Sequence, residues 1–368
     1  MIRHGTFFLP GPTEVRPEIL EELLRPMLPH RSAEFEAIHA RCDAGLRTIF
    51  RTRRPVYIAS ASATGLMEGS IRCAPPGVVL ALVNGAFSER FAQVAVSCGR
   101  EVIRDEVELG LHHTPAQVAA LLAATGARVV TLTHSETSTG AMNDIERIAC
   151  VVHDAGAVIL VDSVTGLAGT PLETDKWDLD FVFTGSQKAL ALPPGLALGV
   201  ASESFIAAAA KVAHRGTYFD LVEFERYAAR NQTPNTPAIS LFQALAAQVE
   251  AIALEGIESR WARHRAMQEM TVDWVATLAT DLDPAFGVLA PKSGRSPTVT
   301  CVTLPRYMSG TAVAANVASA GFVIGAGYGA LRDRTVRIGH MGDHTVEGLS
   351  RCLLAVRGVF ERHASLKR

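Results

Sequence analysis

A lysine in a turn of small residues is the first candidate for chemistry in this sequence. Lys188 stands in Thr184–Leu190 (TGSQKAL), after the apolar run Phe181–Phe183 and before Pro193–Gly195 (PPG). The apolar run predicts a buried strand, and the prolines with glycine predict a turn. A lysine held at the end of such a strand can act as a nucleophile, because its amine condenses with aldehydes. A lone lysine is more often a solvated surface residue.

A carboxylate at the end of another predicted strand gives this lysine a partner. Asp162 ends the aliphatic run Val158–Val161, 26 residues before Lys188 (188 − 162 = 26). Such a run predicts a strand of a parallel sheet, and α/β proteins bind ligands at the carboxyl ends of these strands. A cofactor that needs a lysine for its aldehyde and a carboxylate for its ring nitrogen is pyridoxal phosphate (PLP). The alternative is that Asp162 only caps a turn.

Small and hydroxyl residues follow the predicted strand Val56–Ser60. Ser62, Ala63 and Thr64 open a predicted helix, whose free N–H groups and dipole favour an anion such as the cofactor phosphate. An ordinary helix cap explains the same residues.

Two more strand ends add candidate ligand contacts. Phe87 follows the predicted strand Val78–Val83 and opens a helix to about Cys98; its ring can stack on a flat ligand or belong to the core. The loop His134–Gly140 follows the strand Val129–Thr133. Its hydroxyl groups are suited to hydrogen-bonding the polar edge of a ligand.

An arginine between apolar neighbours is the candidate for substrate binding. Arg337 lies in the predicted strand Val336–Ile338. A guanidinium in apolar surroundings needs a carboxylate or phosphate partner, and its planar fork suits the α-carboxylate of a substrate. A structural salt bridge is the alternative.

These residues require an α/β frame. Strands and helices alternate through Ala201, which predicts right-handed crossovers and a mainly parallel sheet. After Gly256 the pattern predicts a smaller α+β unit with strands near Val299–Leu304 and Val336–Ile338. We expect an extended N-terminal segment (1–15), a large cofactor-binding domain (16–255) and a small C-terminal domain (256–368).

Composition limits the possible partners. The 368 residues are 48% apolar and 20% charged, with a formal net charge of −2, which argues against general nucleic-acid binding. The six cysteines contain no CxxC pair, so neither a disulfide framework nor a zinc site is expected. We expect no metal, no nucleic acid and no membrane partner. The absence of a signal-like or transmembrane stretch predicts a cytoplasmic protein.

Together these stretches resemble the class V aminotransferases, specifically the alanine–glyoxylate and serine–pyruvate branch of the fold-type I PLP enzymes. The matching stretches, in family order, are Leu9–Thr13 (LPGPT), Glu136–Gly140 (ETSTG), Asp162–Val164 (DSV), Gly185–Leu190 (GSQKAL) with Pro193–Gly195, and Arg337–Gly339 (RIG). The resemblance implies a mainly parallel sheet of the seven-stranded type with a smaller C-terminal α+β domain.

The resemblance also implies roles. Lys188 is similar to the Schiff-base lysine and Asp162 to the partner of the pyridine nitrogen. Phe87 matches the stacking aromatic, which is often Trp in relatives. The other implied cofactor contacts within one subunit are Ser62, Ala63, Thr64, Thr137, Val164 and Gln187. Gly11 and Arg337 are implied on the substrate side.

The stretch Gln232–Thr236 resembles the segment that reaches the phosphate of a neighbouring subunit. A homodimer with shared active sites is therefore expected, with Gln232, Asn235 and Thr236 as contacts. The implied activity is ping-pong transamination between a small amino acid (alanine, serine or glycine) and a 2-oxo acid (glyoxylate or pyruvate). Alternatives are 2-aminoethylphosphonate or phosphoserine transamination, a desulfurase or lyase, or a non-catalytic PLP-fold binding protein. Cys301 and Cys352 lie in apolar patterns, which disfavours the desulfurase.

Overall fold

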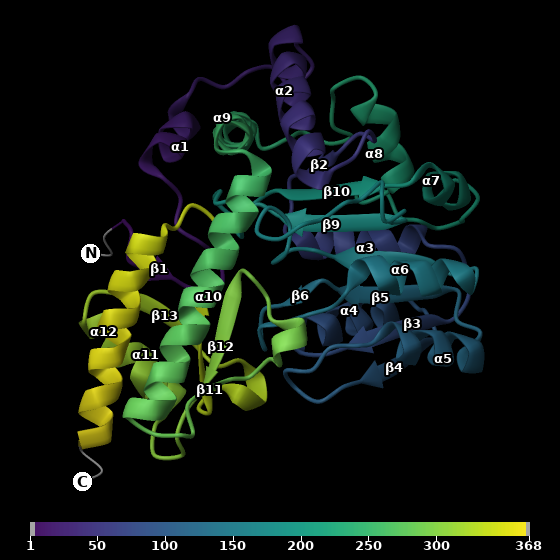
Figure 1. Ribbon diagram of the computed structural model, residues 1–368. Coiled ribbons are helices and arrows are strands. Elements are labelled where there is room, and N and C mark those ends of the chain that lie inside the picture. Colours follow the sequence, from purple (N-terminus) through teal and green to yellow (C-terminus); the bar gives the residue numbers. More distant parts are fainter. Residues whose placement is uncertain (1–3, 366–368) are drawn as a thin grey trace.

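A seven-stranded sheet forms the centre of the computed structural model, which describes residues 4–365 (Figure 1). Its strand order is β2-β10-β9-β8-β5-β3-β4. The strands are β2 (Tyr57–Ala59), β3 (Val79–Val83), β4 (Val102–Glu106), β5 (Val129–Thr133), β8 (Val158–Asp162), β9 (Phe181–Gly185) and β10 (Ala197–Ala201). The five strands from β9 to β4 are parallel, and β10 is antiparallel to both of its neighbours. The predicted α/β fold with a mainly parallel sheet is confirmed.

The direction of β10 follows from its short connection to β9. The chain between Gly185 and Ala197 contains no helix, and a parallel return needs a longer crossover, usually helical. The edge strand β4 was missing from the sequence prediction. Its residues Arg104, Asp105 and Glu106 are charged, which is typical of an edge strand that must not pair with another chain.

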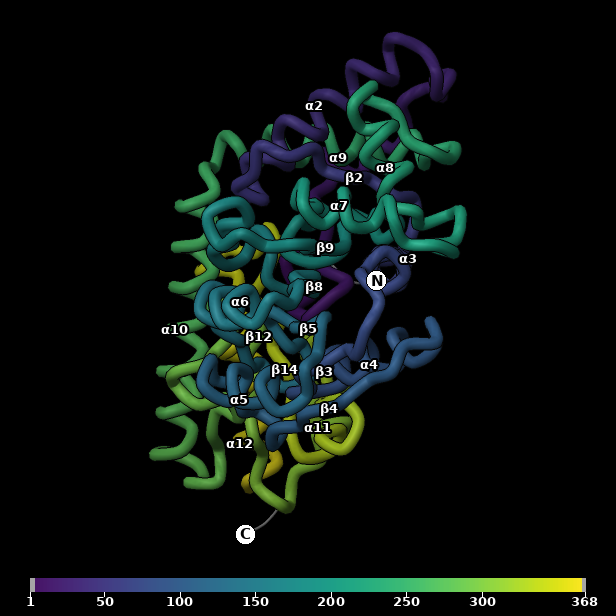
Figure 2. Tube along the Cα trace, turned by 90° about the vertical axis from the view of Figure 1, so that its right-hand side faces the viewer, coloured from purple at the N-terminus to yellow at the C-terminus, as the bar shows by residue number. Residues whose placement is uncertain are grey.

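Helices cover both faces of this sheet, and Figure 2 shows α5 and α6 on one side of the strands with α3 and α4 on the other. A hydrophobic core lies on each face of the sheet, and β3 contributes to both because successive strand residues point to opposite faces. Leu80 and Leu82 pack in the core with α2, α5, α6 and α9. Val79 packs in the other core, with α3 and α4. The helices are α1 (Pro17–Glu21), α2 (Ala33–Phe50), α3 (Ala63–Cys73), α4 (Ala86–Ser97), α5 (Pro115–Thr125), α6 (Ile145–Asp154), α7 (Glu203–Ala209), α8 (Leu221–Ala228) and α9 (Ile239–Glu255).

Side-chain caps begin helices α2 and α6. The Ser32 hydroxyl accepts a hydrogen bond from Phe35 N at the start of α2. Asp144 accepts one from Arg147 N at the start of α6. Each cap satisfies an N–H group that the first helical turn leaves without a partner.

A second, five-stranded sheet is built from both ends of the chain, in the order β1-β13-β14-β12-β11. Its strands are β1 (Phe7–Phe8), β11 (Gly287–Val288), β12 (Val299–Thr303), β13 (Val323–Ala326) and β14 (Thr335–Gly339), and its helices are α10 (Ile257–Asp281), α11 (Gly310–Ser319) and α12 (Val346–Ser365). β1 pairs in parallel with β13, so the N-terminal segment lies beside the C-terminal third (Figure 1). The predicted division into 1–15, 16–255 and 256–368 stays a prediction, and its residues 1–3 and 366–368 lie outside the described part. Within residues 4–365, each helix is too short or too polar to cross a membrane.

An ion pair between α6 and the strand ends beneath it makes stability depend on pH. Asp180 accepts a hydrogen bond from Ile159 N at 2.8 Å, and its carboxylate lies 3.0 Å from His153 Nε2. The hydrogen bond with Asp180 raises the pKa of His153. A raised folded-state pKa contributes stability that is fully present below the unfolded pKa and is lost as the pH rises through the folded value.

We therefore predict that His153→Gln destabilises the protein more at about pH 5.5 than at about pH 8.5, because only protonated His153 gains from Asp180. Urea unfolding of both proteins at the two pH values measures the difference. An equal loss at both values would show that the charge on His153 does not stabilise the fold.

Candidate active site

One pocket of about 150 Å³ lies at the carboxyl ends of strands of the large sheet, and most predicted site residues meet there. Its lining residues are Ser62, Ala63, Thr64, Met67, Phe87, Arg90, Thr133, Ser135, Thr137, Asp162, Val164, Thr165, Gln187 and Lys188. The carboxyl ends of parallel strands share one edge of a sheet, so residues far apart in the sequence come together.

Lys188 is buried at the centre of this pocket, with 7% of its surface exposed. Its Nζ donates a hydrogen bond of 2.5 Å to Pro10 O and lies 5.8 Å from the centre of the Phe87 ring. Burial, together with the charge of Arg337, lowers its pKa to about 8 against the opposing charges of Asp162 and Glu136. A lysine with this pKa has a substantial neutral fraction near pH 7 to 8, which a nucleophile or base requires.

The N-terminal segment lies directly over Lys188. A Cβ on Gly11 would come within 2.5 Å of Lys188 Nζ, and Gly11 has a φ of +96°, so both space and backbone conformation call for glycine. Thr13 fixes the segment, since its N–H donates to Gln187 O and its hydroxyl donates to Lys188 O, each at 3.0 Å. Gly11, predicted on the substrate side, therefore contacts the lysine side chain.

Asp162 is a buried carboxylate, only 3% exposed, at the end of β8. Its Oδ1 accepts a hydrogen bond of 2.9 Å from Val164 N. Burial raises its pKa to about 7, against the opposing effects of the Val164 N–H and Lys188. A buried carboxylate is stabilised by a cationic or proton-bearing partner, and a protonated ring nitrogen is a partner of this kind. The site thus fits PLP at this position.

Glu136 fixes the aromatic wall of the pocket. It is fully buried and accepts hydrogen bonds from the backbone N–H of Phe87 at 3.1 Å and of Ser88 at 3.0 Å. The hydroxyls of Ser88 and Ser138 also donate to it. A carboxylate at the start of α4 is favoured by the helix dipole, and here it holds the backbone that carries the Phe87 ring.

Arg337 is a largely buried cation, and among residues 4–365 it forms no ion pair with a carboxylate. Its Nε donates to Ala326 O at 2.9 Å, and its guanidinium carbon lies 5.5 Å from the centre of the Tyr328 ring. Burial lowers its pKa. The structural salt bridge considered from the sequence is absent from the described residues, so the guanidinium remains available for an anion.

The sequence prediction missed Arg90, which lines the pocket, and Tyr328, whose ring lies near that of Phe87. Arg90 lies one turn after Phe87 on α4, with its guanidinium carbon 5.2 Å from the centre of that ring; the i, i+3 spacing is a signal that could have identified it. Tyr328 precedes a short helical turn between β13 and β14, and its ring centre lies 5.7 Å from that of Phe87. No sequence periodicity marks Tyr328, because this contact joins the two sheets.

The three residues predicted to reach a neighbouring subunit lie outside this pocket. Gln232 donates to Glu36 at 2.7 Å, Asn235 donates to Tyr218 O at 3.5 Å, and Thr236 lines a separate small pocket. Their role in a second subunit stays a prediction.

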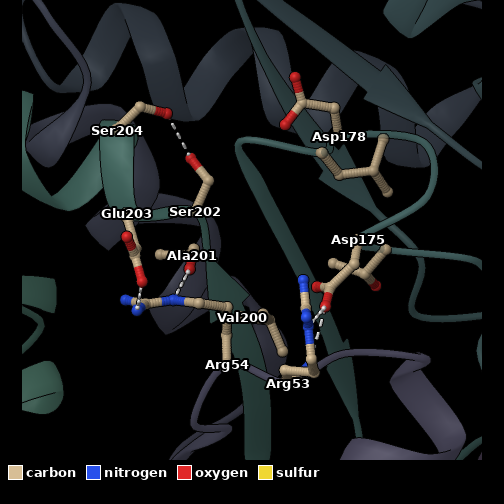
Figure 3. Close-up of a pocket in the computed structure, with 11 residues that line it drawn as sticks. Arg53, Arg54, Asp175, Asp178, Val200, Ala201, Ser202, Glu203 and Ser204 are labelled. Atoms are coloured by element: carbon tan, nitrogen blue, oxygen red, sulfur yellow. Dashed lines mark hydrogen bonds and ion pairs between the residues drawn. The ribbon is translucent and has the colours of Figure 1, made fainter.

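A larger surface pocket of about 450 Å³ lies at the other end of β10 (Figure 3). Its charged side chains pair with one another: Arg54 contacts Glu203 at 3.0 Å, and Arg53 N donates to Asp175 at 2.8 Å. It contains no buried lysine or unpaired buried cation and is a weaker candidate. In the described part of the chain, no group of three or more His, Cys, Asp or Glu side chains is arranged to hold a metal ion.

The frame and the pocket define an α/β protein with a buried lysine and a buried carboxylate in one pocket, and comparison with known proteins identifies its family. Residues 83–339 match the family described as Aminotransferase class-V. An uncharacterised aminotransferase of Methanocaldococcus jannaschii is 33% identical over 340 residues, covering 91% of this chain and 87% of the relative. An L-aspartate–glyoxylate aminotransferase of Paracoccus denitrificans is 28% identical over 358 residues, covering 94% and 88%. The crystal structure of an alanine–glyoxylate aminotransferase from Nostoc sp. superposes with a TM-score of 0.89 at 27% identity, covering 96% and 94%.

The chain belongs to the class V aminotransferase family, and it is an aminotransferase. The resemblance found in its sequence motifs and the predicted fold type are thereby confirmed.

The burial of Lys188 generates a prediction for the cofactor-free protein. Its reaction with trinitrobenzenesulfonate should reach half its maximum rate near pH 8, because burial and Arg337 favour the neutral amine. Arg337→Met should move this midpoint upward and Asp162→Asn downward, since each removes one charge of known sign. Mass spectrometry of the Lys188 peptide follows the labelling. A midpoint near pH 10.5, the ordinary value for lysine, would contradict the buried environment.

Proposed function

We propose that this aminotransferase uses PLP to exchange an amino group between a small neutral amino acid and glyoxylate or pyruvate. The donor is of the alanine, serine or glycine type, and the reaction follows a ping-pong order. The observation that carries the proposal is the arrangement of three groups: the buried Lys188 and Asp162 line one pocket with Phe87, and the partly buried Arg337 forms no ion pair within the described residues.

The residues that would hold the cofactor are those that line the pocket. The start of α3 (Ser62, Ala63 and Thr64) offers N–H groups and hydroxyls to a phosphate. Gln187 lines the same pocket. The Ser62 hydroxyl makes no capping hydrogen bond within its own helix, so it is available for an external anion. Asp162 would face the ring nitrogen.

Three further residues would hold the ring: Val164 and Phe87 at its faces and Thr137 at its edge. Val164 and Phe87 both line the pocket, and the Thr137 hydroxyl lies 2.5 Å from that of Thr165. Flat rings stack favourably on aromatic and apolar side chains, and a hydroxyl pair can donate to a ring oxygen. These roles follow the family resemblance and the position of each side chain in the pocket.

PLP supplies an aldehyde that condenses reversibly with amines and a protonated ring that accepts electrons from the substrate α-carbon. Lys188 would hold that aldehyde, and its Nζ would move the α-proton of the substrate. The pKa of about 8 suits this base near neutral pH. Asp162 would keep a proton on the ring nitrogen, because a nearby negative charge favours the protonated form.

Arg337 would bind the substrate carboxylate through two charge-assisted hydrogen bonds. The groups next to its guanidinium are aromatic or backbone, namely Tyr328 and the carbonyls of Ala326 and Thr137. None of these neighbours is a second cation that could bind a distal acid, which favours a donor with a short neutral side chain.

A second candidate donor is L-aspartate, and Arg90 is the observation that favours it. Arg90 forms no ion pair within the described residues and lines the Lys188 pocket, so it could receive a distal carboxylate. One relative is named for aspartate and another for alanine, and both names include glyoxylate. Assaying alanine, serine, glycine and aspartate with glyoxylate and pyruvate decides between these donors.

We also propose that the enzyme works as a homodimer in the cytoplasm. Gln232, Asn235 and Thr236 lie outside the Lys188 pocket of their own subunit. This position supports the proposal that they contribute to the site of a neighbouring subunit. The six cysteines, all within the described residues, are unpaired, as is usual in a reducing compartment.

The purified protein is expected to absorb in the visible, and borohydride should abolish this band by fixing the cofactor to Lys188. Lys188→Ala should lose the fixed adduct and transamination, whereas the exposed Lys176→Ala should keep both. Absorbance and peptide mass spectrometry read the result. An adduct that persists in Lys188→Ala would assign the aldehyde to another amine.

Loss of Arg337 is expected to affect the substrate and spare the cofactor. Arg337→Ala should lower kcat/KM for alanine about a hundredfold, the loss of ~3 kcal/mol from two charge-assisted hydrogen bonds. Arg337→Lys should recover only part, because it lacks the planar fork. The exposed Arg334→Ala is the matched control.

Ethylamine, which lacks the carboxylate, should react slowly and almost equally with each of these proteins. If alanine and ethylamine are slowed by the same factor in Arg337→Ala, Arg337 is structural and the carboxylate site lies elsewhere.

A further inference from the structure

The backbone around Lys188 is held from outside at four consecutive carbonyl groups. We call Gln187–Leu190 the lysine segment. Thr13 donates to the first two carbonyls at 3.0 Å each, Arg260 Nη2 donates to Ala189 O at 2.7 Å, and Gln248 Nε2 donates to Leu190 O at 2.8 Å. These donors come from the N-terminal segment, from α10 and from α9, so three separate elements fix one short loop.

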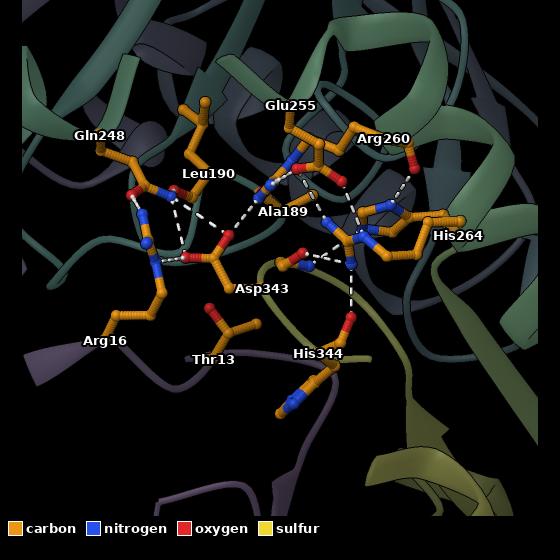
Figure 4. Close-up of polar contacts among 12 residues, drawn as sticks. Thr13, Arg16, Ala189, Leu190, Gln248, Glu255, Arg260, His264, Asp343 and His344 are labelled. Atoms are coloured by element: carbon orange, nitrogen blue, oxygen red, sulfur yellow. Dashed lines mark hydrogen bonds and ion pairs between the residues drawn. The ribbon is translucent and has the colours of Figure 1, made fainter. Parts of the chain in front are cut away.

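Arg260 is a deeply buried cation among these donors, with 1% of its surface exposed. The same Nη2 that binds Ala189 O also contacts Asp343 Oδ1 at 2.8 Å, and Nη1 contacts Glu255 at 2.7 Å. Figure 4 shows Arg260, Gln248 and Arg16 converging on Asp343. A buried ion pair of this kind is costly to break, because either partner alone would remain as an uncompensated charge.

Asp343 connects this network to the substrate side. It follows β14, the strand that carries Arg337, by only a few residues, and its backbone neighbour Gly342 donates to His264 Nε2 at 3.0 Å. His264 lies one turn after Arg260 on α10 and contacts Arg260 O at 2.7 Å. The loop after Arg337 and the loop that carries Lys188 are thus attached to the same turn of α10.

We propose that Arg260 is a positioning residue for transamination, which holds Lys188 in register with Arg337 through Ala189 O and Asp343. This inference rests on the proposed function, in which Lys188 moves the proton of a substrate whose carboxylate is bound by Arg337. The base and the carboxylate site belong to different sheets, so their separation depends on a rigid link between them. A displacement of about 1 Å in such a geometry costs about a hundredfold in rate.

Loss of Arg260 should affect the rate of proton transfer and leave the affinity for the substrate almost unchanged. Without Arg260, the Ala189 carbonyl and Asp343 lose their shared donor, and the lysine segment can shift relative to β14. Arg337 keeps its own contacts with Ala326 O and Tyr328. The carboxylate should therefore still bind, while proton transfer by Lys188 slows.

Arg263 provides a matched control on the same helix. Its Nε contacts Glu255 at 2.7 Å, and its Nη1 donates to Gly342 O at 3.1 Å. Within the described residues it makes no hydrogen bond to the lysine segment. Arg263→Met therefore removes a comparable guanidinium from the same interface without releasing the Lys188 backbone.

The experiment measures the first half-reaction of each holoenzyme with L-alanine and α-deuterated L-alanine by stopped-flow absorbance. For Arg260→Met we expect the rate constant at saturation to fall at least about tenfold with a full isotope effect, and the dissociation constant of alanine to change less than about threefold. Arg263→Met should stay within about twofold of the wild type. A rate constant is independent of the fraction of protein that is folded, so a general loss of stability would not mimic this result.

Equal slowing of both variants, or an unchanged rate constant in Arg260→Met, would overturn the proposal. If Arg260→Met gives no folded holoenzyme, Arg260→Lys replaces it, because lysine keeps the buried positive charge but lacks the planar fork that binds Glu255 and Ala189 O together; an unchanged rate constant there has the same meaning. A wild-type enzyme that shows no half-reaction with any amino acid refutes the proposed function itself, and this is known before any variant is made.

Discussion

The burial of a lysine amine and a carboxylate in one pocket is the constraint on which this structure depends. Lys188 and Asp162 are each almost inaccessible to water, and burial moves the pKa of Lys188 to about 8 and that of Asp162 to about 7. Both shifts bring the pKa values of these side chains close to neutral pH. Small changes in their surroundings then decide which of the two groups is protonated. The low-dielectric environment that shifts these pKa values is therefore also the one in which burying a charged group costs free energy.

The sheet topology makes this burial possible. Lys188 and Asp162 follow β9 and β8, which are neighbours in the parallel sheet, so the two side chains emerge at the same edge. Helix α4 then covers the pocket with Phe87, and Glu136 holds the start of that helix by accepting backbone hydrogen bonds. The buried Glu136 carboxylate thereby has hydrogen-bond partners, as a low-dielectric site requires.

The substrate side is supplied by the second sheet and by the N-terminal segment. β1 joins the edge of that sheet, and the chain then crosses Lys188 at Gly11 before Thr13 attaches it to the lysine segment. Arg337 reaches the Thr137 carbonyl from β14. The candidate site thus lies between the two sheets, and the buried ion pairs of Arg260 with Glu255 and Asp343 connect the elements around it.

Local chemistry in the sequence determined the fold class, the lysine, its carboxylate partner and the arginine. The sequence predicts the apolar strands that lead to Asp162 and to the turn of Lys188, because strand burial and turn formation depend on neighbouring residues. The sequence could not reveal Tyr328 or the links from Arg260 to Ala189 O and Asp343. These contacts join residues dozens to hundreds of positions apart, and which side chains meet across two sheets depends on how the sheets pack. Tertiary structure alone also showed that Arg337 has no carboxylate partner in the described chain, since pairing is decided by distance in space and not along the sequence.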